Sequence, residues 1–388
     1  MSAQGSIKRD KSGRWMFVVD LPSADDKRRQ VMRRGFATKS AAIEALDELK
    51  ASNKAGLFVE PSRLTVGQYL TDTWLPATLT TVRPSTHDTY GRLVRKHLVA
   101  ELGAVRLQQL DTAMVTTFLG KLSAGGLSPK SVRNIHAVLS KALADAVDMG
   151  ALARNPATRA KLPRLERQQP RAWSAEQLGR FLRATADDRL APLWRFFVST
   201  GCRRGEALGL RWDDVDLEAG IVRISHQRVV VGGVVREGAP KTNAGVRSMA
   251  IDQATVAALK AWRSVQAQER LVMGAGWPKN GNLVFTHPDG VGLWPQTITA
   301  RFKAIADELG LPTIGVHGLR HSAATWMISS GVSPKLVSER LGHAHVAITL
   351  ALYTHVLPTH DRDAADAFGA ALEAAQGASP PPVSRLGG

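Results

Sequence analysis

Residues 199–208 read STGCRRGEAL, and this segment and three later ones decide how the chain is interpreted. The second reads HGLRH at residues 317–321, and the third reads LGH at residues 341–343. The fourth reads YTH at residues 353–355 and begins ten residues after His343. A planar guanidinium can bind two phosphate oxygens at once, so arginines in such segments are suited to holding a phosphate group. Each segment alone is a weak signal, and the interpretation depends on all four occurring together.

Length and charge set the context for these segments. The chain has 388 residues, which at about 150 residues per domain suggests two or three domains. It contains 51 Lys and Arg against 34 Asp and Glu, a formal net charge of +17. An excess of this size favours a polyanionic partner such as nucleic acid, the alternative being a basic surface that serves solubility alone. No apolar run approaches the roughly 18 residues of a transmembrane helix, the first residues lack a signal-peptide pattern, and one cysteine fits a reducing compartment. We expect a cytoplasmic protein without a membrane partner.

Residues 1–60 predict a small sheet and one helix. Apolar and β-branched residues favour strands at 15–19 and 30–36, separated by a polar turn at 23–26, and a helix follows from about Ser40. The net charge of this segment is +4, concentrated at residues 27–29 and 33–34. An arginine-rich strand is either the solvent face of a sheet or a DNA-reading surface, and the residues alone leave both interpretations open.

Residues 61–160 change to helical periodicity and predict a small four-helix domain. Thr65 with Gln68 forms a capping box, and further helices are predicted to begin at Ser85, Asp111 and Ser128. The last of them ends near residue 150. Residues 61–170 carry the densest positive charge of the chain, a net +8. Residues 161–172, rich in Pro and Gln and without periodicity, are predicted to be a linker.

Residues 173–375 form the largest predicted domain, in which helices alternate with a cluster of strands. A capping box at Ser174 and Gln177 begins it. Strands are expected at residues 221–224, 228–231, 234–235 and 247–251, with a tight hairpin turn at residues 232–233. From Trp294 the pattern is helical again, and the tail 376–388, which contains three consecutive prolines, is predicted to be disordered.

Together the four segments resemble the boxes of the tyrosine recombinase family, in particular phage and mobile-element integrases. The family patterns are TGxRxxE, HxLRH, LGH and a tyrosine about ten residues later, and all four occur here in order. The resemblance implies a multidomain, mainly α fold with small β-sheets. Its parts would be an N-terminal β-sheet-plus-helix arm-binding domain, a helical core-binding (SAM-like) domain and an α+β tyrosine recombinase catalytic domain.

The resemblance assigns the two catalytic arginines to Arg203 and Arg320, which would neutralise charge on the phosphate. The structural alternative for Arg203 is a surface ion pair with Glu206 or Asp213. We assign that structural role to the neighbouring Arg204 instead.

The nucleophile implied by the family is Tyr353, one of only three tyrosines. Tyr69 and Tyr90 occupy core-facing helical positions and are interpreted as packing residues; a half-buried core residue is likewise the structural alternative for Tyr353. His317 would act as base and phosphate contact, and His343 would donate a hydrogen bond to a non-bridging oxygen.

The histidines also admit a metal-binding interpretation, because HxxxH on a helix places His317 and His321 on one face. No third ligand falls at a usual spacing, so we expect no metal and no other cofactor. His321, His345 and His355 are interpreted as structural or surface residues. Cys202 lacks a partner pattern for a thiol nucleophile and is interpreted as a small buried hydrophobe.

The family places its general acid on a lysine between two strands, and Lys241 occupies that place. It is the only lysine between Ile221 and Ala258. Burial beside cations would lower its pKa toward neutrality, which suits protonation of a leaving oxygen.

By the family's scheme the chain would cut DNA through a 3′-phosphotyrosyl link, release a 5′ hydroxyl and rejoin strands without ATP or metal. The expected partners are double-stranded DNA attachment sites, a homotetramer on a Holliday junction, and DNA-bending or excisionase-type accessory proteins. The protein would integrate or excise a phage or mobile element and associate with the bacterial nucleoid when acting. A helix over residues 361–375 would dock on a neighbouring protomer or pack on its own domain. The alternatives are a relaxing type IB topoisomerase and a DNA-binding regulator without activity.

Overall fold

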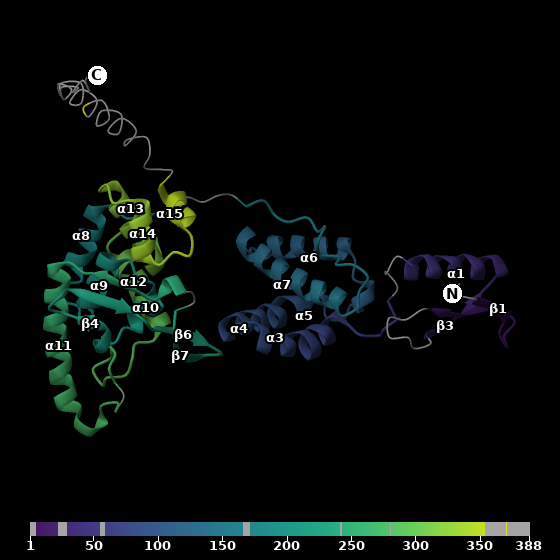
Figure 1. Cartoon of the computed structure of the whole chain (residues 1–388), viewed down its shortest axis with the longest axis horizontal. Coiled ribbons are helices and arrows are strands. Elements are labelled where there is room, and N and C mark those ends of the chain that lie inside the picture. Colours follow the sequence, from purple (N-terminus) through teal and green to yellow (C-terminus); the bar gives the residue numbers. More distant parts are fainter. Residues whose placement is uncertain are drawn as a thin grey trace, which may run out of the picture. The chain divides into compact units, whose positions relative to one another are not determined.

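The computed structural model describes residues 5–21, 29–54, 59–165, 171–240, 243–279, 281–353 and 370. The chain divides into two compact units, residues 1–167 and residues 168–388, and each is described by itself (Figure 1). The predicted linker at 161–172 falls partly outside the described residues, and the tail at 376–388 falls wholly outside them. The helix expected at 361–375 also lies outside them, apart from residue 370. The predicted limits of the three domains, the linker and the tail stay predictions.

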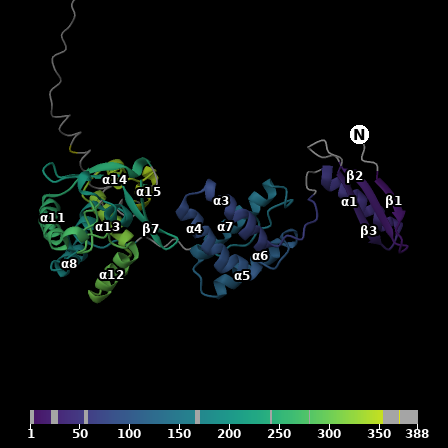
Figure 2. The same cartoon turned by 90° about the horizontal axis from the view of Figure 1, so that it is seen from below.

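The first unit begins with a three-stranded antiparallel sheet and one helix. The strands are β1 (Gly5–Arg9), β2 (Trp15–Leu21) and β3 (Arg29–Phe36), in that order, and the helix is α1 (Lys39–Lys54). Figure 2 shows α1 lying across one face of the sheet. Phe17, Val19, Leu46 and Leu49 are buried between them and form a small core. The predicted strands at 15–19 and 30–36 are confirmed, while β1 was missed.

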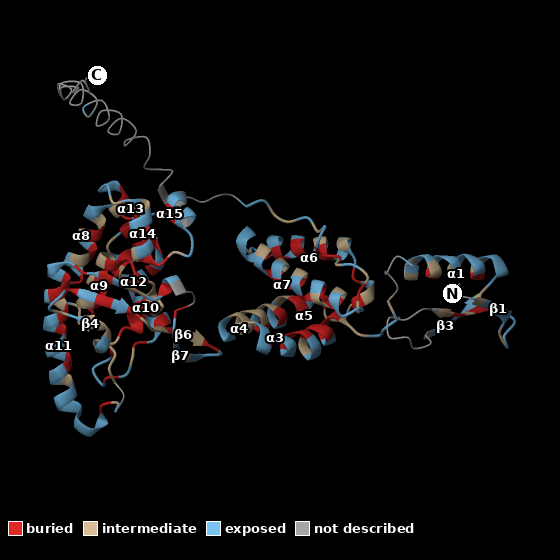
Figure 3. Cartoon of the chain, viewed as in Figure 1, coloured by how far each residue is buried: buried red, intermediate tan, exposed pale blue. Residues whose placement is uncertain are grey.

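The remainder of the first unit is helical, as predicted. Four helical stretches follow one another. The first, residues 66–81, consists of α2 (Val66–Gln68), the π-helix η1 (Tyr69–Trp74) and α3 (Leu75–Thr81). The second, residues 84–102, consists of α4 (Pro84–Leu93), the π-helix η2 (Val94–Leu98) and α5 (Val99–Leu102), and the last two are α6 (Thr112–Ala124) and α7 (Pro129–Asp148). A short 3-10 turn, η3 (Leu107–Gln109), precedes α6. Figure 3 shows the buried residues along the inner sides of these helices.

Side-chain caps fix where these helices begin. The Thr65–Gln68 capping box is present, and Asp111 and Ser128 accept hydrogen bonds from the first turns of α6 and α7. The second stretch begins at Pro84 rather than at Ser85, because proline at the first helical position supplies the helical φ and needs no hydrogen-bond partner for its nitrogen.

The second unit surrounds a small sheet with helices. Its helices before the strands are α8 (Ala175–Ala184), α9 (Ala191–Thr200), α10 (Arg204–Leu208) and the 3-10 turn η4 (Trp212–Asp214). The strands are β4 (Val215–Asp216), β5 (Ile221–Ile224), β6 (Gln227–Val231), β7 (Val234–Gly238) and β8 (Arg247–Ala250), with the 3-10 turn η5 (Asn243–Gly245) before β8. The later helices are α11 (Gln253–Met273), the 3-10 turn η6 (Gly274–Gly276), α12 (Pro295–Glu308), α13 (Val316–Ser329), α14 (Pro334–Leu341) and α15 (Val346–Tyr353).

The strands of this unit include the predicted hairpin, whereas β4 and the pairing of the other strands were not predicted. β4, β5 and β8 form one antiparallel sheet in that order, and β6 and β7 form a separate hairpin. Gly232 and Gly233 have φ of 59° and 75°, the backbone of a two-residue hairpin turn that glycine adopts without strain. Val222 and Ile224 of β5 point into a core that contains Trp173, Phe181 and Phe302. This core supports the helices that carry the conspicuous segments.

Candidate active site

The turn after α9 places Arg203. Helix α9 ends at Gly201, whose φ of 61° is left-handed and favours glycine. A Cβ there would lie 2.8 Å from the Leu341 side chain and 3.0 Å from Ala323 Cβ. Only glycine allows α9 to end this close to α13 and α14, and the chain then turns so that Arg203 becomes the N-cap of α10.

Glu206 is the buried anion of the region. Its side chain is 1% exposed, and it accepts hydrogen bonds from the Arg203 backbone N at 3.0 Å, Arg203 Nη1 at 2.7 Å and Arg247 Nη2 at 2.9 Å. Burial alone would raise the pKa of Glu206, but Arg247 and Arg203 together lower it. The assignment of the ion pair to Arg204 is wrong, because Arg204 donates instead to Thr299 Oγ1 and leaves Glu206 to Arg203.

Helix α13 carries Arg320 into the interior. This side chain is among the largest that are fully buried, and its Nη1 donates to Gly201 O at 3.2 Å. Burial and the nearby charge of Arg203 lower the pKa of Arg320 to about 9. The guanidinium is therefore held in a poorly hydrated place where an incoming anion would be strongly attracted.

The C-terminus of α14 brings three arginines together. Gly342, with φ of 66°, ends the helix, and the backbone N–H groups of Gly342 and His343 donate to the carbonyls of Glu339 and Ser338. A helix leaves its last four carbonyls without intrahelical partners, and its C-terminus favours cations. Here three consecutive carbonyls accept from guanidinium groups: Arg340 O from Arg247 Nε at 2.6 Å, Leu341 O from Arg320 Nη2, and Gly342 O from Arg203 Nη2 at 3.0 Å.

Two histidines adjoin these arginines. Burial, followed by the charges of His321 and Arg320, lowers the pKa of His317 to about 4. Burial, followed by the charges of Arg320 and Arg203, lowers the pKa of His343 to about 4. Both imidazoles are therefore neutral at pH 7, and each has one N–H to donate.

Comparison with known proteins agrees with this geometry. Residues 172–360 match the model of the phage integrase family, and residues 6–52 match that of an arm DNA-binding domain. A tyrosine recombinase XerC-like protein of Caldanaerobacter subterraneus subsp. tengcongensis is 28% identical over 378 residues, 92% of this chain and 96% of that protein. The ICEBs1 integrase of Bacillus subtilis is 28% identical over 289 residues, 73% of this chain and 77% of that integrase.

The chain contains a phage integrase family domain, the catalytic domain of tyrosine recombinases.

Solved structures share the fold of this recombinase. The Tn1549 transposon integrase in complex with transposon right end DNA superposes with a TM-score of 0.67 at 20% identity, covering 79% of this chain and 99% of that one. The lambda integrase tetramer bound to a Holliday junction gives a TM-score of 0.58 at 15% identity, covering 89% and 94%. The predicted family, the mainly helical fold with small sheets and the DNA strand cleavage and rejoining activity are confirmed.

Of the predicted nucleophile the structure describes the backbone alone, and the predicted general acid is not described. Tyr353 is the last residue of α15, four residues after Thr349 and therefore on the same side of that helix, and its side chain lies outside what is described. Lys241, between β7 and β8, and His355 lie outside the described residues.

His343 has a partner on the helix of Tyr353. Its Nδ1 lies 2.8 Å from Oγ1 of Thr349, which is fully buried. If the hydroxyl donates, the imidazole carries its proton on Nε2, the nitrogen that can then donate to a phosphate oxygen.

The residues interpreted as structural behave accordingly. Tyr69 is buried and donates to Ala142 O at 2.7 Å, and Tyr90 stacks on Trp74. Cys202 is buried, and burial raises its pKa to about 12, so the thiol is unreactive.

His321 and His345, the other predicted structural histidines in the described part of the chain, are not among the proposed catalytic residues. His345 is exposed, whereas His321 is half-buried and packs edge-on against His317 with ring centroids 5.0 Å apart. Among the described residues no three His, Cys, Asp or Glu side chains form a metal-binding group. Within the same residues no helix is long and apolar enough to span a bilayer.

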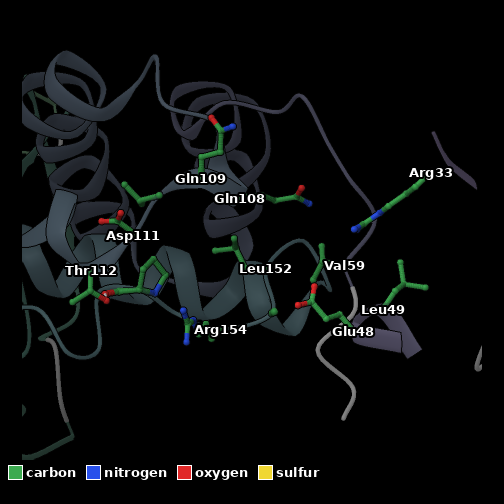
Figure 4. A pocket seen from close by; sticks show the side chains of 13 residues that line it. Arg33, Glu48, Leu49, Val59, Gln108, Gln109, Asp111, Thr112, Leu152 and Arg154 are labelled. Carbon is green, nitrogen blue, oxygen red and sulfur yellow. The ribbon is translucent and has the colours of Figure 1, made fainter. Parts of the chain in front are cut away.

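Sequence reasoning missed Arg247 and the role of the α14 terminus. A lone arginine in a strand resembles a solvent-facing residue, and it is contacts with Glu206 of α10 and with the end of α14 that bury Arg247. The first unit contains a cavity of about 430 Å³, lined among others by Arg33, Asp111 and Arg154 (Figure 4). None of the predicted catalytic residues lines that cavity, so it is separate from the candidate site.

Proposed function

We propose that this recombinase cuts and rejoins attachment-site DNA with Tyr353 as the nucleophile. The phenol oxygen attacks the scissile phosphorus, the bond from phosphorus to the 5′ oxygen breaks, and a 3′-phosphotyrosyl link forms. His317 accepts the phenol proton, and Lys241 donates a proton to the departing 5′ oxygen. Attack by a 5′ hydroxyl of the partner duplex reverses these steps and joins the exchanged strands.

The arrangement of Arg203 and Arg320 on one helix terminus supports this proposal. Their guanidinium groups are fixed by adjacent carbonyls, and the Arg203 side chain stays 38% exposed, so it can meet DNA. A preorganised cation needs no reorganisation as charge develops on the phosphate, which is how such groups lower the barrier. Neutral His343 completes the set as a hydrogen-bond donor to a non-bridging oxygen.

The partners follow from the same chemistry and from the relatives. Four protomers would act on two duplexes through a Holliday junction, as the lambda integrase tetramer is bound. The basic strands of residues 1–60 would bind arm-type sites, and the net charge of +8 over residues 61–170 would bind the core site. DNA-bending and excisionase-type proteins would set direction, and the reaction would take place on DNA in the bacterial cytoplasm.

The test begins with the site sequence, recovered by repeated binding of the full-length protein to a randomised duplex pool. A duplex containing that site is nicked beside the scissile phosphate, so that the short 5′-hydroxyl fragment is lost and the covalent adduct accumulates. Wild-type protein should form a denaturation-resistant adduct, and Tyr353→Phe should bind the duplex within a few fold yet form none.

An adduct with Tyr353→Phe would overturn the assignment of the nucleophile. Supercoiled plasmid with and without the selected site separates the alternatives. Relaxation independent of the site would indicate a topoisomerase, and binding without an adduct would indicate a regulator.

A further inference from the structure

Arg247 is buried and fully engaged, although it is not among the family's assigned catalytic residues. Its side chain is 7% exposed, and each of its three nitrogens donates to a different segment. Nη2 donates to Glu206 on α10 at 2.9 Å, Nε to Arg340 O at the end of α14 at 2.6 Å, and Nη1 to Gly245 O before β8 at 3.0 Å. One guanidinium thus ties together three segments that are distant in the sequence.

These contacts reach Arg203 by two routes. The first route runs through Glu206. Its Oε1 accepts from Arg203 Nη1, and its Oε2 accepts from both the Arg203 backbone N–H and Arg247 Nη2. The second route runs through the C-terminus of α14. There Arg340 O accepts from Arg247, and Gly342 O, two residues later, accepts from Arg203. A shift of Arg247 would therefore move both anchors of Arg203.

There is little free space in which such a shift could be absorbed. A Cβ on Gly342 would lie 2.6 Å from Ala244 O, 3.0 Å from Arg247 Nη1 and 3.2 Å from Arg247 Cδ. The Arg247 side chain therefore packs directly against the backbone of Gly342, whose carbonyl accepts from Arg203 and which precedes His343. Packed contacts of this kind transmit displacement.

We propose that Arg247 is a positioning residue for phosphodiester cleavage, holding Glu206 and the end of α14 so that Arg203 keeps one edge of its guanidinium for the DNA. The inference rests on the proposed function of Arg203. Arg247 itself makes no contact with the reacting atoms. Without Arg247, Glu206 still holds Arg203, but among the described residues the pair loses the guanidinium that ties Glu206 to Arg340 O at the end of α14.

The pH dependence of cleavage distinguishes this role from simple support of the fold. The charged and titratable groups that interact with Glu206 are Arg203, Arg247, Arg320, His317 and Cys202. Removing Arg247 takes away the largest interaction that lowers the pKa of Glu206, so that pKa rises although Arg203 remains. As pH falls, the variant would then protonate Glu206 and lose its hold on Arg203, while wild type keeps the carboxylate ionised.

The experiment measures single-turnover adduct formation on the nicked core-site duplex between about pH 5.5 and 9. The variants are Arg247→Met, Arg247→Lys, Glu206→Gln and the double variant Glu206→Gln/Arg247→Met. Arg189→Met is the matched control, because Arg189 also joins a carboxylate, Glu269, to a backbone carbonyl, that of Thr286, with no contact to the candidate site. Duplex affinity and the thermal unfolding midpoint are measured for each.

Arg247→Met should lower the adduct rate at least about 10-fold, the scale of misplaced catalytic groups, with duplex affinity within about 3-fold. It should also lose rate toward low pH more steeply than wild type. In the Glu206→Gln background the same change should cost less than about 3-fold, because two residues that act through one network are not additive. Arg189→Met should leave the rate per folded molecule unchanged.

Equal losses from Arg247→Met in both backgrounds, or an equal loss in Arg189→Met, would overturn the proposal. If Arg247→Met does not fold, Arg247→Lys decides. A single ammonium on a flexible chain cannot reproduce three fixed contacts, so a wild-type rate and pH profile in Arg247→Lys would also overturn it. Either result leaves the Tyr353 test untouched, and an adduct with Tyr353→Phe would refute the proposed function instead.

Discussion

Replacing Gly342 by alanine should damage both the stability and the chemistry of the second unit. The residue has φ of 66°, where a side chain costs about 1–2 kcal/mol. The new methyl group would also lie 2.6 Å from Ala244 O, a backbone atom that cannot rotate away. Relieving such overpacking typically costs a further ~1–3 kcal/mol. The expected loss in the free energy of unfolding is therefore about 2–5 kcal/mol.

Gly310 provides the control, since its φ is 59° and nothing lies within 4 Å of an added Cβ. Gly310→Ala should lose only the backbone contribution of about 1–2 kcal/mol. The difference between the two variants in urea denaturation isolates the clash at the end of α14.

Adduct formation gives the second measurement. Gly342 O holds Arg203, so Gly342→Ala should slow cleavage at least about 10-fold, whereas Gly310→Ala should not. Equal destabilisation of the two variants, together with a wild-type cleavage rate in Gly342→Ala, would refute the view that this terminus organises the site.

Four further predictions concern the proposed chemistry. Arg203→Lys or Arg320→Lys should slow adduct formation by roughly 10² or more, because a point charge cannot replace bidentate contact; rates near wild type would return that arginine to a structural role. Lys241→Ala should cleave ordinary DNA at least about 10²-fold slower yet approach the wild-type rate on DNA with sulfur at the 5′ bridging position, a leaving group that needs no proton. Thr349→Val should slow cleavage roughly 10-fold or more and change the His343 tautomer seen by ¹⁵N NMR, while Thr349→Ser should restore both. His317 and His343 have pKa values of about 4 when folded and near 6.5 when unfolded, so the unfolded chain binds more protons between these values; the urea midpoint should fall from pH 7 to pH 5, and less steeply in His343→Asn.

Local signals in the sequence predicted much of this architecture. Capping residues such as Thr65, Asp111 and Ser174 mark helix starts because they satisfy backbone groups within one turn. The turn at residues 232–233 was equally readable, since consecutive glycines adopt positive φ without strain. β1 was missed because its GSIKR sequence has one large apolar residue and depends on pairing with β2.

The sequence singled out most residues of the candidate site but did not show which residues they contact. The boxes identified Arg203 and Arg320 because those residues recur in fixed local patterns. The sequence could not tell which neighbour, Arg203 or Arg204, meets Glu206, since the answer depends on the left-handed turn at Gly201. Nor could it show that Arg247 is buried, because two segments far from it in the chain, α10 and the end of α14, enclose it.

The charge balance around the α14 terminus suits one stage of the reaction more than another. Among the described residues there, Arg203, Arg247 and Arg320 carry three positive charges, Glu206 carries one negative charge, and both histidines are neutral. A resting phosphodiester brings one negative charge and leaves this cluster with an uncompensated positive charge. The five-coordinate phosphorane brings two, and in the proposed reaction His317 has by then gained the proton of the phenol, so a more positive cluster faces a more negative group. Electrostatic attraction would therefore increase as the phosphorus gains its fifth ligand, and the proposed site would bind the transition state more tightly than the intact DNA strand.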